Sequence, residues 1–484
     1  MVQNQLFNNS QHGFVCNRSC ETQLIVYYSR ILDELETKGV ADAVYLDFAK
    51  AFDKCDHGVI LHKLKEFGIG GLVEVWIHGF LTNRQQQVRV LGQLSDKVWV
   101  TSGVPQGSVL GPLLFVILMS DIDAGIDFAS VFSYADDTKA LQGISNPADQ
   151  INLQYDLQSF FSWADINNAD FNLDKFESIT FSASGISHHY LDPEGNVIKA
   201  KTHLRDLGII MSNDATFHRH IQVIVAKGRK LSGWALRVFD SREETLMKTL
   251  YQSLIRHSLE YCSPLWFPID QENISAIEKI QRAFTKRIDG LQNLNYWQRL
   301  EKLNLYSLER RRERYVILYI WKSLHNLVPP FGLQYQSFEP ENGVFLRLPT
   351  LPKAPGTNHV SNLIQRSILY QGVRLFNSLP KHLRLASKQT DDKGETSEDS
   401  PPSLLKYKDD LDKYLQRIPD QPTIPYPPRS SATNSIIDQK MYIRPVKQSS
   451  TQKTKRSACK KRNTADVGDG PPPKKRFVSR WDKP

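Results

Sequence analysis

The chain has 484 residues, of which 40% are hydrophobic and 10% aromatic, and this length and composition suffice for the cores of two or three domains. No apolar run approaches the roughly 20 residues that cross a membrane, and the N-terminus lacks the basic-then-apolar pattern of a secretory signal, so we expect no membrane partner. The five cysteines are scattered and odd in number, which indicates free thiols in a reducing compartment.

The net charge of +9 is unevenly distributed. Residues 440–484 contain 14 Lys and Arg but only 3 Asp and Glu, a balance of +11, so the rest of the chain sums to −2. A basic balance is typical of nucleic-acid partners, and here that inference belongs first to the C-terminal segment.

His12, Cys16 and Cys20 follow one another at intervals of four residues. The spacing allows part of a zinc site, but a structural zinc site needs four ligands. With no fourth ligand nearby, we favour ordinary packing of these side chains.

The periodicity of apolar residues predicts alternating helices and short strands as far as residue 181, then mostly helix. Strand 204–210 contains a tight Gly, and helix dominates from 218 to 330. Basic residues line that helical region, as a solvated face or as contacts with a nucleic-acid backbone. The expected helices of the first part are 22–35, 57–67, 72–81, 112–122 and 148–167, and the expected strands are 43–46, 86–90, 97–101 and 178–181.

A hairpin is predicted over 129–138, with its turn at Ala135-Asp136-Asp137. Asp47 ends the apolar strand 43–46, and if that strand neighbours the hairpin, three carboxylates converge. Because like charges repel, such a cluster indicates divalent cations, and all-oxygen ligands favour Mg²⁺. Two such ions can hold the attacking and leaving oxygens of an in-line phosphoryl transfer.

These segments resemble the ordered motifs of reverse transcriptases. Segment 43–53 is similar to motif A, GVPQGSVLGPLLF at 103–115 to motif B, and YADD at 134–137 to motif C. The set is most similar to non-LTR retrotransposons of the jockey/CR1 type and covers residues 8–380. Supporting segments are 11–24 before motif A, 172–175 as motif D, 204–209 as the primer-grip segment, and 261–266 with 310–324 in the C-terminal region.

The resemblance implies an α+β fold: a right-hand polymerase palm, in which helices cover an antiparallel sheet, with partial fingers and a helical thumb. The implied parts are partial fingers at 1–40, palm at 41–215, helical thumb and C-terminal region at 216–330, a C-terminal extension at 331–386, a linker at 387–403, and a mostly disordered, basic, Pro-rich tail at 404–484. A short helix is expected over 404–416, and disorder beyond Ile418.

Metal ligands are implied by the same resemblance. Asp47 and Asp136 would be the principal ligands of two Mg²⁺ ions, for which Mn²⁺ can substitute, with Asp137 as a supporting carboxylate. The backbone carbonyl of Phe48 would join them.

The nucleotide-binding residues implied by the resemblance are Phe52, Pro105, Gln106 and Gly107. Phe52 would exclude a 2′-hydroxyl and so favour dNTPs, although a Phe is usually an ordinary core residue. The other three would form the loop against nucleotide and template base, since Gly permits close backbone approach and Gln offers a donor and an acceptor.

Lys175 would protonate the leaving pyrophosphate, the alternative being a plain surface lysine. Phe176 departs from the family, which has a small hydroxyl residue there. The basic fingers residues that grip the triphosphate lie upstream in the family, so we expect an N-terminally truncated element without its endonuclease, with Arg18 as a candidate substitute.

The implied function is RNA-directed DNA polymerisation on an RNA template from a DNA primer or target DNA, with dNTPs as substrates. The alternative is a catalytically inactive remnant that binds nucleic acid; an intron maturase shares only the palm motifs. Basic clusters at 453–476 resemble a nuclear localisation signal, which predicts a nuclear and cytoplasmic protein, and a nonspecific RNA-binding tail is the other interpretation.

Overall fold

The computed structural model describes residues 8–338, 346–352, 356, 358–384, 403–422 and 434–440. Every described residue belongs to a single compact unit. The predicted linker, apart from Ser403, and the localisation signal at 453–476 lie outside the described residues.

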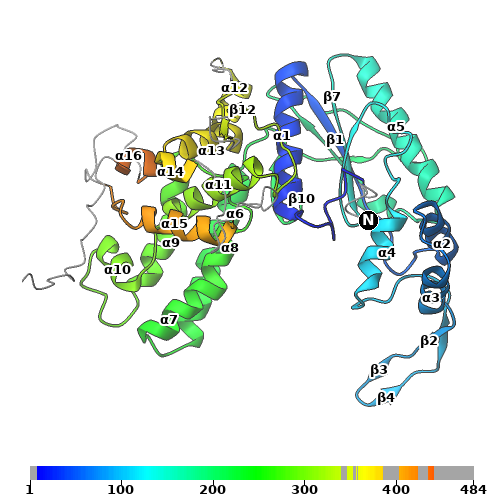
Figure 1. The fold of residues 1–484 in the computed structure, drawn as a ribbon, viewed down its shortest axis with the longest axis horizontal. Coiled ribbons are helices and arrows are strands. Elements are labelled where there is room, and N and C mark those ends of the chain that lie inside the picture. Colours follow the sequence, from blue (N-terminus) through cyan, green and yellow to red (C-terminus); the bar gives the residue numbers. More distant parts are fainter. Residues whose placement is uncertain are drawn as a thin grey trace, which may run out of the picture. The chain divides into compact units, whose positions relative to one another are not determined.

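A five-stranded sheet, ordered β6-β7-β1-β8-β9, forms the centre of the N-terminal half (Figure 1). All neighbours pair antiparallel except β8 with β9, so the antiparallel sheet of the predicted palm is confirmed. The strands are β1 (Ala41–Leu46), β6 (Ser130–Tyr134), β7 (Asp137–Gly143), β8 (Glu177–Phe181) and β9 (Lys199–Ala200).

Helices cover both faces of this sheet. Successive side chains of β1 point to opposite faces, and they are buried on both. Ala43 belongs to the core shared with α1 (Cys20–Lys38), while Val44 and Leu46 belong to the core shared with α4 (Leu110–Leu118) and α5 (Pro147–Ile166). Figure 1 shows α1 and α5 on opposite sides of β1 and β7.

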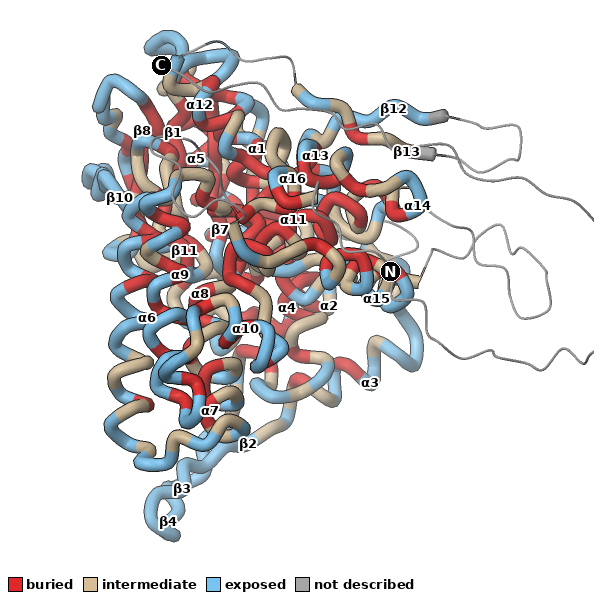
Figure 2. The backbone as a smooth tube through the Cα atoms, turned by 90° about the vertical axis from the view of Figure 1, so that its left-hand side faces the viewer, coloured by how far each residue is buried: buried red, intermediate tan, exposed pale blue. Residues whose placement is uncertain are grey.

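The segment between β1 and α4 forms two helices and a long two-stranded arm. The predicted helices are α2 (His57–Glu66) and α3 (Leu72–Leu81). The predicted strand pair is present but interrupted: β2 (Arg84–Gln86) pairs with β5 (Val98–Val100), and β3 (Arg89–Val90) with β4 (Gln93–Leu94). Figure 2 shows β3 and β4 exposed.

The prediction of one strand over 204–210 is wrong, because the chain reverses within it. β10 (His203–Asp206) and β11 (Ile209–Ser212) pair antiparallel. Leu207 (φ 43°) and Gly208 (φ 90°) form the turn, and two consecutive left-handed residues produce a tight hairpin turn.

The helical prediction for 218–330 is confirmed. None of the helices in the described part of the chain is long and apolar enough to cross a bilayer. The elements are α6 (His218–Val238), α7 (Glu244–Leu250), the π-helical η3 (Tyr251–Arg256), α8 (His257–Glu260), α9 (Gln271–Thr285), α10 (Tyr296–Leu303) and α11 (Leu308–Leu324). After them come β12 (Tyr335–Phe338), β13 (Leu346–Pro349), α12 (His359–Arg366), α13 (Ile368–Asn377), α14 (Lys381–Arg384), α15 (Leu404–Leu415) and α16 (Ile436–Gln439).

The arginines of α11 are not a free basic face. Arg310 and Arg312 are fully buried, Arg311 pairs with Glu260, and Arg314 pairs with Asp412 on α15. Burial of a charge is costly unless it is paired. Arg311 and Arg314 are paired, whereas none of the Arg312 guanidinium nitrogens has a hydrogen-bond partner. The Arg residues of α11 are therefore largely buried in the protein and do not form a nucleic-acid surface.

The prediction of disorder beyond Ile418 is wrong for part of the chain. The Asp420 carboxylate accepts hydrogen bonds from Ser307 and Asn434. The backbone N–H of Ile436, a fully buried residue, donates to Glu313 at 2.9 Å. These contacts order short polar segments that local composition marks as disordered.

A buried ion pair joins the sheet to α1 and to the β10–β11 hairpin. Lys139 of β7 pairs with Asp206 of β10, and their side chains are only 3% and 4% exposed. Lys139 Nζ also donates to Gln23 Oε1 at 3.2 Å and lies 4.2 Å from the ring centroid of Tyr27. The Tyr45 hydroxyl of β1 donates to Asp206 at 3.1 Å, so four elements meet at this pair.

Removing one member of this pair is predicted to destabilise the fold more than removing both. Lys139→Met or Asp206→Leu leaves an uncompensated buried charge, at a cost of about 3–5 kcal/mol. The double variant leaves no charge and is expected to lose much less than the sum of the two. Chemical denaturation of the four proteins measures this, and additive losses would contradict it.

Candidate active site

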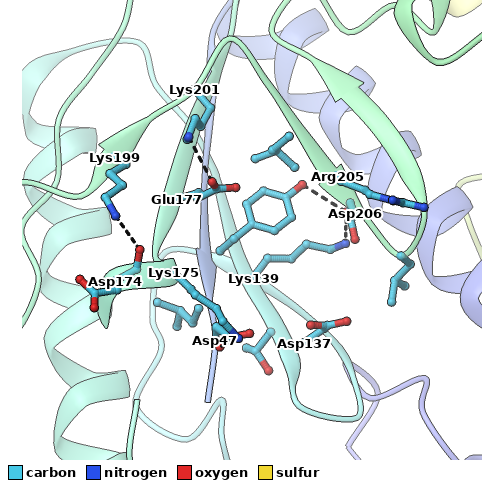
Figure 3. Close-up of a pocket in the computed structure, with 15 residues that line it drawn as sticks. Asp47, Asp137, Lys139, Asp174, Lys175, Glu177, Lys199, Lys201, Arg205 and Asp206 are labelled. Carbon is cyan, nitrogen blue, oxygen red and sulfur yellow. Dashed lines mark hydrogen bonds and ion pairs between the residues drawn. The ribbon is translucent and has the colours of Figure 1, made fainter. Parts of the chain in front are cut away.

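The register of β1 against β7 places two of the predicted carboxylates together. Leu46 pairs with Thr138, and Asp47 and Asp137 are the residues just beyond that pair. Figure 3 shows the side chains of Asp47 and Asp137 lining the same cavity. The expected pairing of these two strands is confirmed.

The third carboxylate belongs to the turn between β6 and β7. Tyr134 pairs with Asp137, so Ala135 and Asp136 form a two-residue turn, with Ala135 at φ 55°. The predicted hairpin is therefore confirmed. Asp136 is half-buried, and Asp137 is more exposed.

Negative charge and loss of solvent both act on these carboxylates. Desolvation raises the pKa of Asp136, and the Asp47 carboxylate adds to the shift. Desolvation, together with Asp136, Asp206 and Asp47, raises the pKa of Asp137 to about 6. The fold thus holds these groups where their charged forms are disfavoured, and a nearby cation would favour those charged forms.

Lys175 lies beside the Asp47 carboxylate. It ends the 3₁₀ turn η2 (Leu173–Lys175), and the Asn172 N–H anchors that turn to the Asp47 carbonyl at 2.8 Å. Its Nζ is 2.9 Å from Asp47 Oδ2, although the side chain is 62% exposed. The hydrogen bond to Asp47 raises the pKa of Lys175, so the ammonium form is favoured beside the carboxylates.

Phe176, the departure from the family pattern, is a core residue. It is 1% exposed, and its ring packs against Phe161 and Phe171 at centroid distances of 6.2 and 5.3 Å. Phe48 stacks on the same Phe171 at 4.5 Å. Both aromatic residues therefore anchor the backbone next to Asp47 and Lys175.

The donor set suits a hard cation by its chemistry. Asp47, Asp136 and Asp137 offer only oxygen, and a cation would relieve their repulsion; at present the Lys175 ammonium supplies the positive charge next to Asp47. Within the described ranges no three His, Cys, Asp or Glu side chains are gathered closely enough to hold a metal.

That finding also bears on the N-terminal zinc alternative. His12 is buried, and its Nδ1 lies 3.0 Å from the Thr22 hydroxyl. Burial lowers the pKa of His12 to about 3. Cys16 is exposed, so packing accounts for the His12 side chain.

Phe52 and the motif B loop form a second group of predicted residues. Phe52 stacks on Phe115 at 4.2 Å and meets Phe14 edge-on at 6.0 Å. The Val104 N–H donates to the Phe52 carbonyl at 2.9 Å. The loop and Phe52 are therefore brought together, as expected.

Within the loop, Gln106 is exposed and donates from Nε2 to Asp53 Oδ1 at 2.9 Å. Pro105 is half-buried, and Gly107 has φ +83° with open space where a Cβ would stand. Gly107 is thus required by its backbone conformation.

Sequence analysis missed a set of basic residues beside the carboxylates. A cavity of about 360 Å³ is lined by Asp47, Asp137 and Lys175 together with Lys199, Lys201 and Arg205. In Figure 3, Lys199 and Lys201 point to Asp174 and Glu177. The alternation of Lys around Ala200 is the only sequence signal that could have revealed them, and they suit a ligand that carries phosphate.

Residues 1–211 match the family described as reverse transcriptase (RNA-dependent DNA polymerase). The chain is 29% identical over 292 residues to the RNA-directed DNA polymerase from mobile element jockey of Drosophila melanogaster, covering 58% of this chain and 32% of that protein. It is 24% identical to the probable polymerase from transposon BS of the same species, over 66% of this chain and 37% of that one. The chain thus spans about a third of the length of these relatives.

Among solved structures, apo telomerase from Candida tropicalis is similar with a TM-score of 0.36 and 11% identity. The likeness covers 66% of this chain and 50% of the telomerase chain.

Gly103, which begins the loop, is predicted to tolerate no side chain. Gly103 has a φ of +82°, and a Cβ there would lie 2.5 Å from the Asp53 carbonyl oxygen. Gly92 has a similar φ of +88° but open surroundings, so Gly92→Ala reports the backbone strain alone, about 1–2 kcal/mol. Gly103→Ala is expected to cost about 1–3 kcal/mol more through overpacking. Equal losses in thermal unfolding would contradict this.

Asp137→Asn is predicted to stabilise the metal-free protein at high pH. Because the folded pKa is raised to about 6, stability is lost as pH rises from about 4, the unfolded value, through 6. Discounted for solvent screening, the gain above pH 7 is about 1 kcal/mol, or a few degrees in Tm, and it vanishes near pH 4. Asp96→Asn, on the exposed arm, is the control. A gain at pH 4 equal to that at pH 8 would be the contrary result.

Proposed function

We propose that this chain, whose residues 1–211 are a reverse transcriptase domain of the kind found in non-LTR retrotransposons, catalyses RNA-directed DNA synthesis. The observation that carries the proposal is that the β1–β7 register places Asp47 beside Asp137, with Asp136 on the adjoining β6–β7 turn. In this reaction the 3′-hydroxyl of a DNA strand attacks the α-phosphate of a nucleotide and releases pyrophosphate.

Reverse transcriptases generally use divalent metal ions. For this chain we propose two Mg²⁺ ions, replaceable by Mn²⁺, held by Asp47 and Asp136 with Asp137 in support and the Phe48 carbonyl as a further oxygen. When bound, such ions stabilise charge on the attacking and leaving oxygens. The raised pKa values of Asp136 and Asp137 support this role, since a cation favours their charged forms.

Lys175 is proposed to protonate the departing pyrophosphate. Its ammonium form is favoured by Asp47, and its exposed side chain is free to turn from the carboxylate to a phosphate. Lys199, Lys201 and Arg205 line the same cavity, and their cationic groups would bind phosphate oxygens.

Phe52 is proposed to select dNTPs. Its stacking on Phe115 and its edge contact with Phe14 fix the ring, and a fixed ring can exclude a 2′-hydroxyl by clash. Pro105, Gln106 and Gly107 are proposed to contact the nucleotide and template base. The exposure of Gln106 leaves its amide accessible to a base.

The proposed partners are an RNA template, a DNA primer or target DNA, and dNTPs. Jockey and BS proteins are named as RNA-directed DNA polymerases of mobile elements, which supports this set. Nuclear entry through the basic clusters at 453–476 is part of the proposal, because such clusters of Lys and Arg are typical of nuclear localisation signals.

Primer extension on an RNA template with Mg²⁺ tests this function. The wild-type chain is expected to extend the primer, and Asp136→Ala is expected to lose at least 10³-fold in rate because a metal ligand is removed. Asp33→Ala, which removes an exposed surface carboxylate on α1, is the matched control and should extend normally.

Failure of the wild type to extend, under conditions in which a longer relative does, would overturn the proposal. Nucleic-acid binding without extension would instead favour the catalytically silent remnant, and such binding would be equally strong in Asp136→Ala.

A further inference from the structure

The residues just before α1 pair with the edge strand β6 of the central sheet through an isolated bridge. The Ser133 N–H of β6 donates to the Ser10 carbonyl at 2.9 Å, and the His12 N–H donates to the Ser133 carbonyl at 2.8 Å. Gln11 and Ser133 form a parallel bridge. The segment therefore runs beside β6 and ends next to the turn that carries Asp136.

The Gln11 side chain holds that turn directly. It is 2% exposed, and its Nε2 donates to the Ala135 carbonyl at 3.0 Å while its Oε1 accepts from the Ala135 N–H at 2.8 Å. The same Oε1 accepts from the Gly13 N–H at 2.7 Å. One planar amide thus satisfies both peptide groups of Ala135, which needs a donor and an acceptor on a single side chain.

Ala135 is the residue that needs such support. Its φ of 55° is a left-handed conformation that costs a residue with a Cβ about 1–2 kcal/mol, and strained residues persist only where their surroundings hold them. The next residue along the chain is Asp136. The orientation of the Ala135 peptide groups therefore sets the direction in which the Asp136 carboxylate leaves the turn.

Close packing completes the arrangement. A Cβ on Gly13 would stand 2.3 Å from the Ala135 nitrogen, so only glycine lets the segment approach this turn. Arg18 donates to the carbonyls of Asn8, Asn9 and Gln11, which fixes the backbone that carries the Gln11 side chain. Arg18 is thereby engaged in structure, and its candidacy for gripping a triphosphate is weakened.

We propose that Gln11 is a positioning residue for the polymerase reaction: its amide clamps the Ala135 turn and so orients Asp136. Gln11 acts through the backbone and needs no contact with substrate. The inference rests on the proposed function, but the clamp itself is a structural claim that can be tested without turnover.

Hydrogen exchange tests the clamp in the metal-free full chain. Gln11→Met keeps the side-chain length but removes all three hydrogen bonds, so exchange in a peptide covering 131–138 is expected to quicken at least 10-fold, with β1 (41–46) unchanged. Gln281→Met is the matched control, because Gln281 is also fully buried and hydrogen-bonded but lies in α9. It should leave exchange at 131–138 as in the wild type.

The pH profile of Gln11→Glu tests the connection to catalysis. A protonated glutamic acid can donate to the Ala135 carbonyl as the amide does, whereas the carboxylate repels it. The kcat of Gln11→Glu relative to wild type is therefore expected to rise at least 10-fold from pH 8.5 to 6.0. Gln11→Met should lose at least 10-fold in kcat at every pH, with the dNTP KM changed less than 3-fold.

These readouts separate the clamp from the function. Unchanged exchange at 131–138 in Gln11→Met, or equal acceleration throughout the palm, would overturn the clamp even if the wild type extends primers. A kcat of Gln11→Met within 3-fold of the wild-type value would overturn the catalytic connection. Fast local exchange in a chain that extends no primer would support the clamp and count against the proposed function instead.

Discussion

Electrostatic repulsion among Asp47, Asp136 and Asp137 is the constraint that the surrounding structure must overcome. Carboxylates held near one another raise each other's pKa values, as they do for Asp136 and Asp137. The β1–β7 ladder imposes this proximity, because its register leaves no freedom once both faces of the sheet are buried. The two packed cores therefore hold these carboxylates near one another in spite of their mutual repulsion.

Support for the carboxylates comes from parts of the chain that are distant in sequence. The Lys139–Asp206 pair joins β7 to the β10–β11 hairpin and to α1, and Lys139 lies two residues along β7 from Asp137. Gln11 holds the preceding turn, and Lys175 balances the charge of Asp47. Each support uses a different interaction, so the site does not depend on one contact alone.

Local pattern was enough to predict the features that depend on local chemistry. The hairpin with Asp136 at its turn, the strand before Asp47 and the helix over 22–35 follow from alternation, turn residues and helical periodicity. Features set by tertiary contact were missed. The burial of Arg310, the ordering of 434–440 and the hydrogen bonds of Gln11 each depend on residues more than 100 positions away. The β10–β11 turn was missed because Leu207 adopts a conformation rare for its residue type.

Anomalous diffraction from crystals of the chain grown with Mn²⁺ tests the central claim most directly. The account predicts anomalous density between the carboxylates of Asp47 and Asp136, with the Lys175 ammonium displaced from Asp47. Density absent from this place at saturating Mn²⁺, with the Lys175–Asp47 ion pair retained, would contradict the assignment of these residues as a cation-binding catalytic centre.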